Sequence, residues 1–348
     1  MISSLKLQNF RSYKDEAFEF DNGINIIVGP NAIGKTNLIE ALVFILKGYS
    51  FRVKDIDLIK DNEEFLRLEI NIKDEQRQVL VNKQQEKTIK NFKLNDKNYK
   101  RLTKNHIYPI VLFEPTHLNL FVLNKDYRRK YLDDLVSEIE PEHPKIISQY
   151  NRALIQRNNL LKKGQLNNLF PWNLRLSQLS GQIIKNRGLL IKEINPRIRK
   201  IYQKLSDSNQ EVSLSYISNI ELNNYETKFL NYLEKNALDD QRVGFTQKGI
   251  HRDDFSAKID DRNSTRKASR GEQRSIILAL KIAEKLILEE YQKRDVIFIL
   301  DDVFSELDGQ RRKFLLDEIK NNQSFITTTD ADMVINHLND NYKIIALV

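Results

Sequence analysis

Two sequence patterns that normally stand close together lie near opposite ends of this chain. Residues 29–36 read G-P-N-A-I-G-K-T and match the phosphate-binding pattern G-x-x-x-x-G-K-[ST]. An apolar run over residues 296–300 is closed by the carboxylates of Asp301 and Asp302. More than two hundred residues separate the two patterns. If both serve one site, the chain must leave an α/β core and return to it, which predicts an inserted second domain.

The eight residues of the first pattern are candidate ligands for a nucleotide. They follow an apolar run at 23–28, typical of a buried strand, and precede an amphipathic helix predicted over 35–46. Glycines let backbone N–H groups curl around phosphates at a helix N-terminus. Lys35 would bind the same oxygens, and Thr36 would offer its hydroxyl to Mg²⁺. The predicted cofactors are ATP and Mg²⁺, and the predicted nucleotide ligands are Gly29, Pro30, Asn31, Ala32, Ile33, Gly34, Lys35 and Thr36.

The paired aspartates are the candidate partners of that loop. A carboxylate at the carboxyl end of a buried parallel strand is where a magnesium ligand belongs in α/β nucleotide-binding folds. Thr36 and Asp301 are therefore the candidate metal ligands. Asp302 could reach a water that attacks the γ-phosphate, as general base or as orienter, so Asp302 and Lys35 are the candidate catalytic residues. The alternative is that the two aspartates merely begin a loop.

A third segment, residues 269–273, reads S-R-G-E-Q about thirty residues before Asp301. It resembles the signature S-x-G-[EQ]-x of ABC ATPases. Ser269 and Gly271 at a helix start could offer a hydroxyl and a bare backbone N–H to phosphate. The same residues also fit a capping box, with Glu272 three positions after a serine N-cap. The position of the segment in the chain favours the signature.

The charge of the chain is concentrated in one region. The formal net charge is +8, and residues 145–204 contain thirteen Lys and Arg against the single Glu193. Such an imbalance suits sequence-independent contact with phosphates, although a solvated helix face is the alternative. The candidate DNA contacts are Arg197, Arg199 and Lys200.

Composition excludes several other classes. The absence of cysteine excludes disulfides, thiolate metal sites and cysteine catalysis. No stretch approaches eighteen uncharged apolar residues, and the start of the chain lacks an apolar signal segment, so a cytoplasmic protein without a membrane partner is expected.

The pattern of apolar residues divides the chain into three parts. Residues 119–240 repeat apolar side chains at three- and four-residue spacing, which predicts amphipathic helices separated at Pro141, Pro144, Pro171 and Pro196. Strand-like alternation precedes and follows this region. The predicted domains are an N-terminal part of an ATPase head at 1–118, a basic helical arm at 119–240, and the C-terminal part of the head at 241–348.

Several ordered blocks resemble the RecF family, recombination mediators related to the SMC chromosome ATPases, over essentially the whole chain. Besides the phosphate loop they are N-F-R-S-Y at 9–13, S-F-R at 50–52, F-E-P at 113–115 with R-R-K-Y-L-D at 128–133, G-I-H-R-D-D at 249–254 and L-D-D-V-F-S-E-L-D at 300–308. Arg11 and Ser12 fall in the block that contacts nucleotide in the family. Ala32 stands where the family usually has Gly, and Ile250 where it has Pro. His251 does not belong to a group of potential metal ligands and is expected to be structural.

The resemblance implies an α/β ABC-type, SMC-like P-loop ATPase head with an inserted, mainly α-helical arm. It implies a homodimer closed by ATP, in which Ser269 and Gly271 of one subunit touch the γ-phosphate held by Lys35 of the other. It also implies a DNA replication and repair protein that clamps double-stranded DNA near gaps, with RecR and RecO as partners at the nucleoid. ATP hydrolysis would be weak, DNA-dependent and used for release.

Two other functions share some of these motifs. An ABC transporter motor would carry its helical insert shortly before the signature, whereas the basic helical region here begins early. A long-armed chromosome organiser would need sustained heptads, which residues 119–240 lack. Another SMC-like ATPase of DNA metabolism, nuclease-associated or chromosome-organising, is the remaining alternative.

Overall fold

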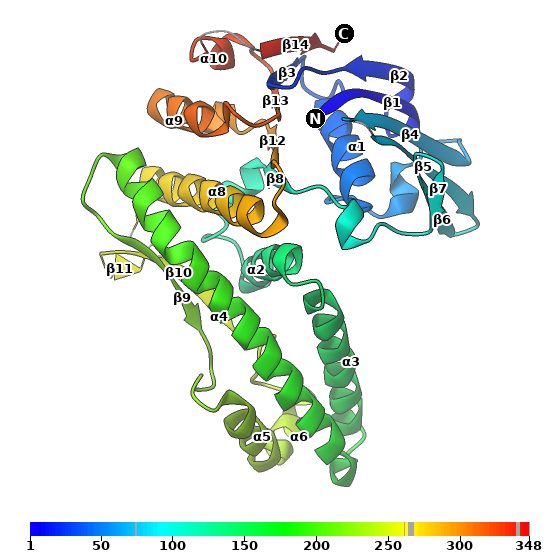
Figure 1. Cartoon of the computed structure of the whole chain (residues 1–348). Helices are drawn as coiled ribbons and strands as arrows, with labels where there is room; N and C mark the ends of the chain where they lie inside the picture. Colours follow the sequence, from blue (N-terminus) through cyan, green and yellow to red (C-terminus); the bar gives the residue numbers. More distant parts are fainter. Residues whose placement is uncertain (74, 261, 264–267, 339–341, 348) are drawn as a thin grey trace. The chain divides into compact units, whose positions relative to one another are not determined.

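The computed structural model describes residues 1–73, 75–260, 262–263, 268–338 and 342–347. Contacts between Cα atoms divide the chain into two compact units (Figure 1). We call Met1–His117 together with Leu288–Val348 the head unit, and Leu118–Ile287 the arm unit. The head unit thus contains both ends of the chain, and the arm unit is inserted between them.

One layer of the head unit is an antiparallel sheet with the strand order β2-β1-β4-β5-β6-β7. Apolar side chains alternate with polar ones along β1 and β4, so one face of these strands is buried and the other is solvated. The strands are β1 (Ile2–Phe10), β2 (Tyr13–Glu19), β4 (Phe65–Ile72), β5 (Glu75–Gln84), β6 (Lys87–Leu94) and β7 (Lys97–Tyr99).

A second sheet of the head unit is parallel and has the order β14-β3-β13-β12-β8. Its central strands are buried along their whole length, which explains their nearly continuous apolar sequences. The strands are β3 (Ile24–Val28), β8 (Ile110–Phe113), β12 (Ile297–Asp301), β13 (Ser324–Thr328) and β14 (Tyr342–Ala346). The strands expected at 23–28 and before Asp301 are confirmed.

Helix α1 (Lys35–Lys47) packs against both sheets of the head unit (Figure 1). Ten of its residues are buried, and its apolar side chains join the main core together with side chains from both sheets. Gly48 ends the helix in the left-handed conformation with φ 82°. Helices α9 (Gly309–Ile319) and α10 (Asp332–Ile335) follow β12 and β13 along the chain.

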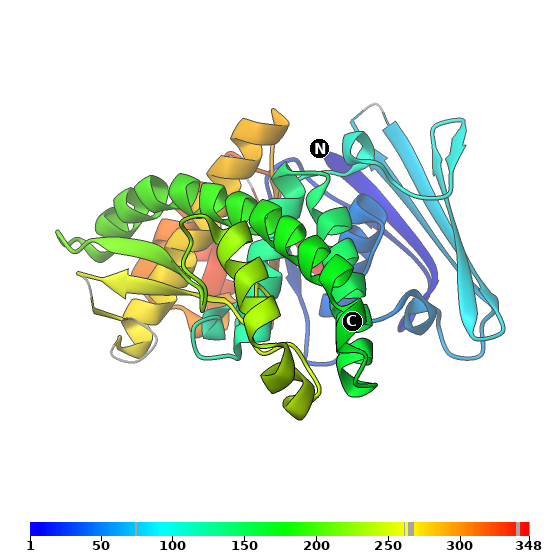
Figure 2. The same ribbon diagram turned by 90° about the horizontal axis from the view of Figure 1, so that it is seen from below.

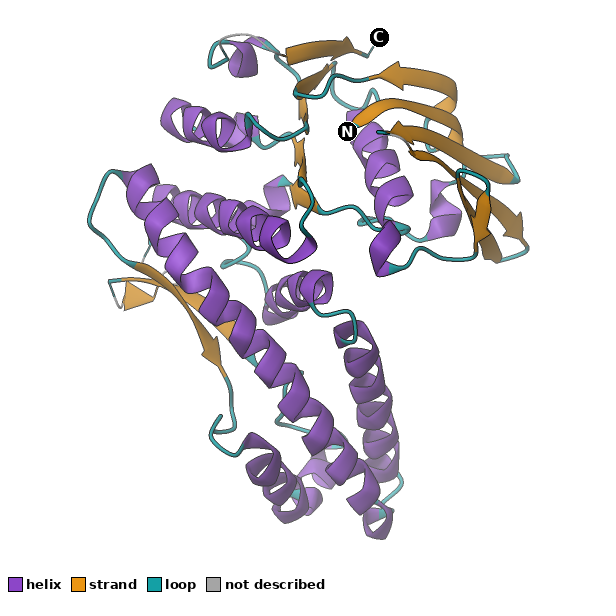
Figure 3. Cartoon of the chain, in the orientation of Figure 1, coloured by secondary structure: helices purple, strands orange, loops and turns teal. Residues whose placement is uncertain are grey.

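The arm unit is mostly helical (Figure 3). Its longest element is α4 (Phe170–Ser206), which packs against α3, α5 and strand β9 of the small sheet β11-β10-β9 (Figure 2). The other helices are α2 (Lys125–Ile139), α3 (His143–Lys162), α5 (Tyr225–Lys235), α6 (Ala237–Val243) and the first part of α8 (Arg270–Gln292); the strands are β9 (Val212–Ile217), β10 (Asp254–Ile259) and β11 (Arg262–Asn263). Short 3₁₀ helices cover Asp55–Leu58, Lys104–His106, Pro115–Asn119, Leu166–Asn168 and Phe304–Glu306.

Three details of the arm differ from the sequence-based expectation. Pro196 does not separate two helices but lies inside α4, because the buried side chains on either side of it, Ile194 and Ile198, hold one continuous apolar face. The region expected to be helical contains β9, which pairs with β10. That pairing, and the packing of α2 against β10, place residues 241–287 in the arm unit rather than in the head.

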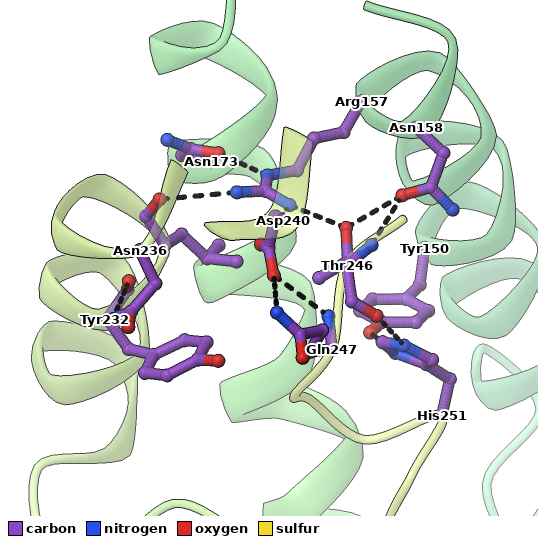
Figure 4. Close-up of polar contacts among 11 residues, drawn as sticks. Tyr150, Arg157, Asn158, Asn173, Tyr232, Asn236, Asp240, Thr246, Gln247 and His251 are labelled. Carbon is purple, nitrogen blue, oxygen red and sulfur yellow. Dashed lines mark hydrogen bonds and ion pairs between the residues drawn. The ribbon is translucent and has the colours of Figure 1, made fainter. Parts of the chain in front are cut away.

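Polar side chains are buried inside the arm unit and hydrogen-bonded there (Figure 4). Arg157 and Asp240 are both fully buried, and Arg157 Nη1 lies 2.8 Å from Asp240 Oδ2. His251 Nδ1 lies 2.7 Å from the hydroxyl of Tyr150, and its Nε2 lies 3.1 Å from the carbonyl oxygen of Thr246. Burial lowers the pKa of His251 to about 4, so the neutral imidazole is held as a structural group.

No helix within the described ranges is both long enough and apolar enough to span a membrane.

Candidate nucleotide-binding site

The phosphate loop lies between the buried strand β3 and the first turn of α1. Gly34 is the N-cap of α1 and has φ 116°, a conformation that favours glycine. A Cβ at Gly34 would also lie 3.0 Å from Ser12 Oγ. The first backbone N–H groups of α1 have no partner within the helix, so the loop and helix start offer the donors that an anion requires.

Ala32 occupies a second unusual position in the loop. Its φ is 66°, in the left-handed region that costs a residue with a Cβ about 1 kcal/mol. This is the position where the sequence departs from the expected glycine. The loop therefore holds an alanine in a left-handed conformation, at the expense of backbone strain.

Lys35 is folded back over the loop. Its ammonium donates hydrogen bonds to the carbonyl oxygens of Gly29 at 2.7 Å and Pro30 at 2.9 Å. Its side chain is largely buried, so the charge is held close to the loop rather than in solvent. A phosphate seated on the loop would lie within reach of this cation.

Thr36 and Asp301 come from distant parts of the chain and meet in the head unit. Thr36 Oγ1 donates to Asp301 Oδ1 at 3.1 Å. Asp301 is the last residue of β12, and β13 separates this strand from β3, which leads into the loop. The contact therefore follows from the order of the parallel strands. Thr36 and Asp301 are the two side chains predicted to share a magnesium site.

The donor set fits Mg²⁺. Within the described residues there is no cluster of three or more His, Cys, Asp or Glu that could hold a metal by itself. Mg²⁺ usually keeps water and phosphate oxygens and takes only one or two protein oxygens. The hydroxyl of Thr36 and the carboxylate of Asp301 are hard oxygen donors of that kind.

Asp302 follows directly and has φ 52°, which Asp tolerates better than most residues with a Cβ. Partial burial raises the pKa of Asp302, the charges of Asp301 and Glu306 raise it further, and the charge of Lys35 lowers it. Asp302 is therefore a carboxylate that accepts a proton more readily than an exposed aspartate.

The turn between β1 and β2 is fastened to α1. Arg11 Nε donates to Glu40 Oε2 at 2.9 Å, and Asn37 Nδ2 donates to Ser12 Oγ at 3.0 Å. Tyr13 Oη donates to the carbonyl oxygen of Gly34 at 3.1 Å. Arg11 and Ser12, expected to contact nucleotide, are thus held beside the start of the phosphate-loop helix.

Glu40, a fully buried carboxylate in the middle of α1, was not among the residues predicted from the sequence. It accepts hydrogen bonds from Arg11 and, at 2.5 Å, from the hydroxyl of Ser50. Glu40 therefore links the blocks at 9–13 and 50–52. A lone glutamate on the apolar face of the predicted helix was the signal that could have found it.

The segment at 269–273 forms a capping box at the start of α8. The backbone N–H of Ser269 donates to Glu272 Oε2 at 2.7 Å, and the N–H of Glu272 donates to Ser269 Oγ at 3.2 Å. Ser269 is exposed. Ser269 and Gly271 belong to the arm unit, whereas the phosphate loop and Asp301 belong to the head unit.

The basic residues of the arm divide into buried and exposed ones. Arg157 and Arg187 are buried and paired with Asp240 and Asp133, so they do not contribute to a binding surface. Of the three candidate DNA contacts, Arg197 is half-buried and paired with Glu193, Arg199 is exposed and lies 3.1 Å from Glu211, and Lys200 is exposed.

Helix α4 has a second basic feature that was not predicted from the sequence. Lys185, Lys192 and Arg199 recur every seven residues and are all exposed, so they share one face of the helix. The intervening positions on this face, 189 and 196, are Leu and Pro and carry no charge. We call Lys185, Lys192 and Arg199 the α4 stripe. Its seven-residue spacing was the signal available in the sequence.

The chain is similar to known proteins over nearly its whole length. Residues 1–347 match the family described as RecF/RecN/SMC N terminal domain. The DNA replication and repair protein RecF of Acetivibrio thermocellus is 32% identical over 351 residues, which cover 96% of this chain and 95% of that protein.

Solved structures show the same relationship. A structure described as the recombination mediator protein RecF-ATPrS in RecFOR pathway superposes with a TM-score of 0.86 at 30% identity, over 99% of this chain and 96% of that one. An SMC head bound to the C-winged helix domain of ScpA has a TM-score of 0.54 at 18% identity, over 99% of this chain and 93% of that one, and supports the fold alone. The expected fold class is confirmed, and the chain belongs to the RecF family of SMC-related, ABC-type P-loop ATPases.

Proposed function

We propose that this chain is an ATP-switched DNA clamp of replication and repair. It binds ATP and Mg²⁺, dimerises on ATP, holds double-stranded DNA near single-strand/double-strand junctions, and releases it after slow, DNA-dependent hydrolysis. The observation that carries the proposal is the 3.1 Å contact between Thr36 and Asp301, beside a loop over which Lys35 is held. The relative bound to ATPrS supports the same nucleotide class.

Different residues of the head unit would bind the nucleotide, hold the metal and assist hydrolysis. The loop N–H groups and Lys35 bind the phosphates, and Thr36 and Asp301 hold Mg²⁺. Bound Mg²⁺ neutralises phosphate charge and orients the γ-phosphate. Asp302 orients the attacking water or accepts its proton. Asp302 is one methylene shorter than glutamate, and a less well placed water would make turnover slow.

A second subunit completes the site. Ser269 and Gly271 of one chain would approach the γ-phosphate held by Lys35 of the other. The capping box supports this role, because the hydroxyl of Ser269 accepts a hydrogen bond from the backbone N–H of Glu272 and, among the residues that the structure describes, makes no bond with its own proton. The start of the 23-residue helix α8 adds the positive end of a helix dipole.

The α4 stripe is the better supported DNA contact within the arm. Its cations are about 10 Å apart along the helix at 1.5 Å per residue. Lys and Arg on such a surface would bind phosphates without reading sequence, which suits a clamp on any duplex or gapped DNA. Arg197 and Lys200 lie at its margin in the sequence. RecR and RecO are the proposed partners, because the similar RecF structure is described in the RecFOR pathway, and the cytoplasmic nucleoid is the proposed location.

Size-exclusion chromatography with and without ATP, together with duplex binding at several salt concentrations, tests the proposal. Lys35→Ala should abolish nucleotide binding, whereas Ser269→Arg should leave nucleotide binding intact and block dimerisation. A chain that stays monomeric with ATP and ignores duplex DNA at low salt would refute the clamp function.

A further inference from the structure

We propose that Thr327 is a positioning residue of the ATP site, because its one hydroxyl holds both the metal-side carboxylate of Asp301 and the backbone of Asp302. Thr327 Oγ1 donates to Asp301 Oδ1 at 2.8 Å, and the backbone N–H of Asp302 donates to Thr327 Oγ1 at 2.9 Å. None of the motifs in the sequence includes Thr327. The inference rests on the proposed ATP-binding function.

The location of Thr327 follows from the parallel sheet. On β13 it pairs with Asp301 of β12 on one side and with Ile27 of β3 on the other. It therefore lies between the strand that ends in the aspartates and the strand that leads into the phosphate loop. Thr327 is fully buried, so water cannot replace its hydroxyl without a rearrangement of the sheet.

The hydroxyl of Thr327 makes two bonds of opposite direction. A threonine hydroxyl has one proton to donate and lone pairs to accept, and both functions are used here. The carbonyl oxygen of Leu300 lies at 3.5 Å, so the carboxylate of Asp301 at 2.8 Å is the better acceptor. Valine has nearly the same shape but can make neither bond.

The bond to Asp301 orients its carboxylate. Oδ1 of Asp301 accepts from both Thr36 and Thr327. Oδ2 has no hydrogen-bond partner among the residues that the structure describes, so it is the oxygen that would face Mg²⁺. Removing a group that hydrogen-bonds to a metal ligand and orients it lowers metal affinity by about 10- to 100-fold.

The bond from Asp302 fixes an unfavourable backbone conformation. Asp302 has φ 52°, and its N–H is satisfied by Thr327 rather than by a neighbouring backbone carbonyl. Without this acceptor, the N–H of Asp302 would lose its partner and the residue could relax toward an ordinary strand conformation. Asp302 would then no longer be held where it can reach the attacking water.

The test compares Thr327→Val with Thr327→Ser, which keeps the hydroxyl, and with Ser324→Ala, a buried hydroxyl at the other end of β13. ATP affinity is measured by calorimetry in EDTA and in Mg²⁺, alongside ATP turnover and thermal unfolding. Thr327→Val should bind ATP in EDTA as the wild type does, but its Mg²⁺-dependent gain in affinity should fall by about tenfold or more. Its turnover should fall as well, and Thr327→Ser should restore both quantities.

Three outcomes would overturn the inference. They are an unchanged Mg²⁺ effect in folded Thr327→Val, an equal loss in Thr327→Ser, and an equal loss in Ser324→Ala. If Thr327→Val does not fold, the decision rests on Thr327→Ser and on Thr327→Ala. Thr327→Ala then has to lose the Mg²⁺ effect that Thr327→Ser keeps. A wild-type chain that fails to bind ATP would instead refute the proposed function.

Discussion

The buried ion pair between Arg157 and Asp240 supplies a sharp test of what stabilises the arm unit. Both side chains are fully buried, and their charges lie 2.8 Å apart (Figure 4). Burial lowers the pKa of Arg157, whereas the hydrogen bond and the charge of Asp240 raise it. The cost of desolvation and the attraction between the charges therefore oppose each other, and the pair as a whole adds little stability.

Removing one partner should be far more costly than removing both. In Arg157→Met, the partners that the described residues leave to the Asp240 carboxylate are the backbone N–H and the side-chain amide of Gln247, at 3.2 and 3.3 Å. The acceptors Asn173 Oδ1 and Thr246 Oγ1 lose their donor at the same time. An uncompensated buried charge of this kind costs about 3–5 kcal/mol. The double variant Arg157→Met/Asp240→Leu should lie within about 2 kcal/mol of the wild type.

Urea unfolding followed by tryptophan fluorescence measures these differences. Trp172 is the one tryptophan of the chain and packs against the core cluster of the arm, so the signal reports the arm unit. With a slope of about 2 kcal/mol per molar urea, the single variant should shift the midpoint down by about 2 M. Arg152→Met, an exposed arginine on the same helix, is the matched control and should change stability by less than about 0.5 kcal/mol.

The interpretation is wrong if Arg157→Met lowers the free energy of unfolding by less than about 1 kcal/mol, because a buried carboxylate without its charged partner should destabilise the fold by more than that. It also fails if the double variant loses as much as the two single variants together. That result would mean that the charges act independently, despite their contact.

The remaining predictions concern pH, the phosphate loop and DNA. Because burial holds the pKa of His251 at about 4 while the unfolded imidazole titrates near 6.5, the unfolded state binds more protons as the pH falls through this window. The free energy of unfolding should thus fall between pH 6.5 and 4, by about 2 kcal/mol at pH 5. In His251→Gln the free energy of unfolding should depend less on pH over this range. An equal pH dependence in the variant would contradict this prediction. Ala32→Gly should raise the stability of the head unit by about 1 kcal/mol in calorimetry by removing backbone strain, and a lower melting temperature would refute it. Reversing the charges of Lys185, Lys192 and Arg199 should weaken duplex binding. It should also reduce the slope of the logarithm of the binding constant against the logarithm of the salt concentration by about 2–3. An unchanged slope would show that the α4 stripe does not contact DNA.

Local sequence signals were sufficient for much of the head unit. The phosphate loop, the buried strand before it and the helix from Lys35 were predictable because a strand–loop–helix unit is encoded within about twenty consecutive residues. The same holds for β12 with its terminal aspartate, because its apolar run can be recognised without a distant partner.

The arm shows where such signals were insufficient. Thirteen basic residues look alike in the sequence, yet Arg157 and Arg187 are buried in ion pairs while Lys185 and Lys192 face solvent. Their burial depends on which element packs against each face of the helix, and that element is distant in the sequence. Pro196 lies inside α4 for the same reason, since packing of the neighbouring face outweighs its local preference.

The sequence by itself predicted that two distant patterns share one nucleotide site and that a domain lies between them. Only the tertiary structure decided how the halves meet. The parallel order β3-β13-β12 places Thr36 and Asp301 3.1 Å apart and puts Thr327 between the two strands. It also assigns residues 241–287 to the arm. The physical reason is that strand order and burial arise from contacts between residues far apart in the chain, whereas motifs and periodicity are local.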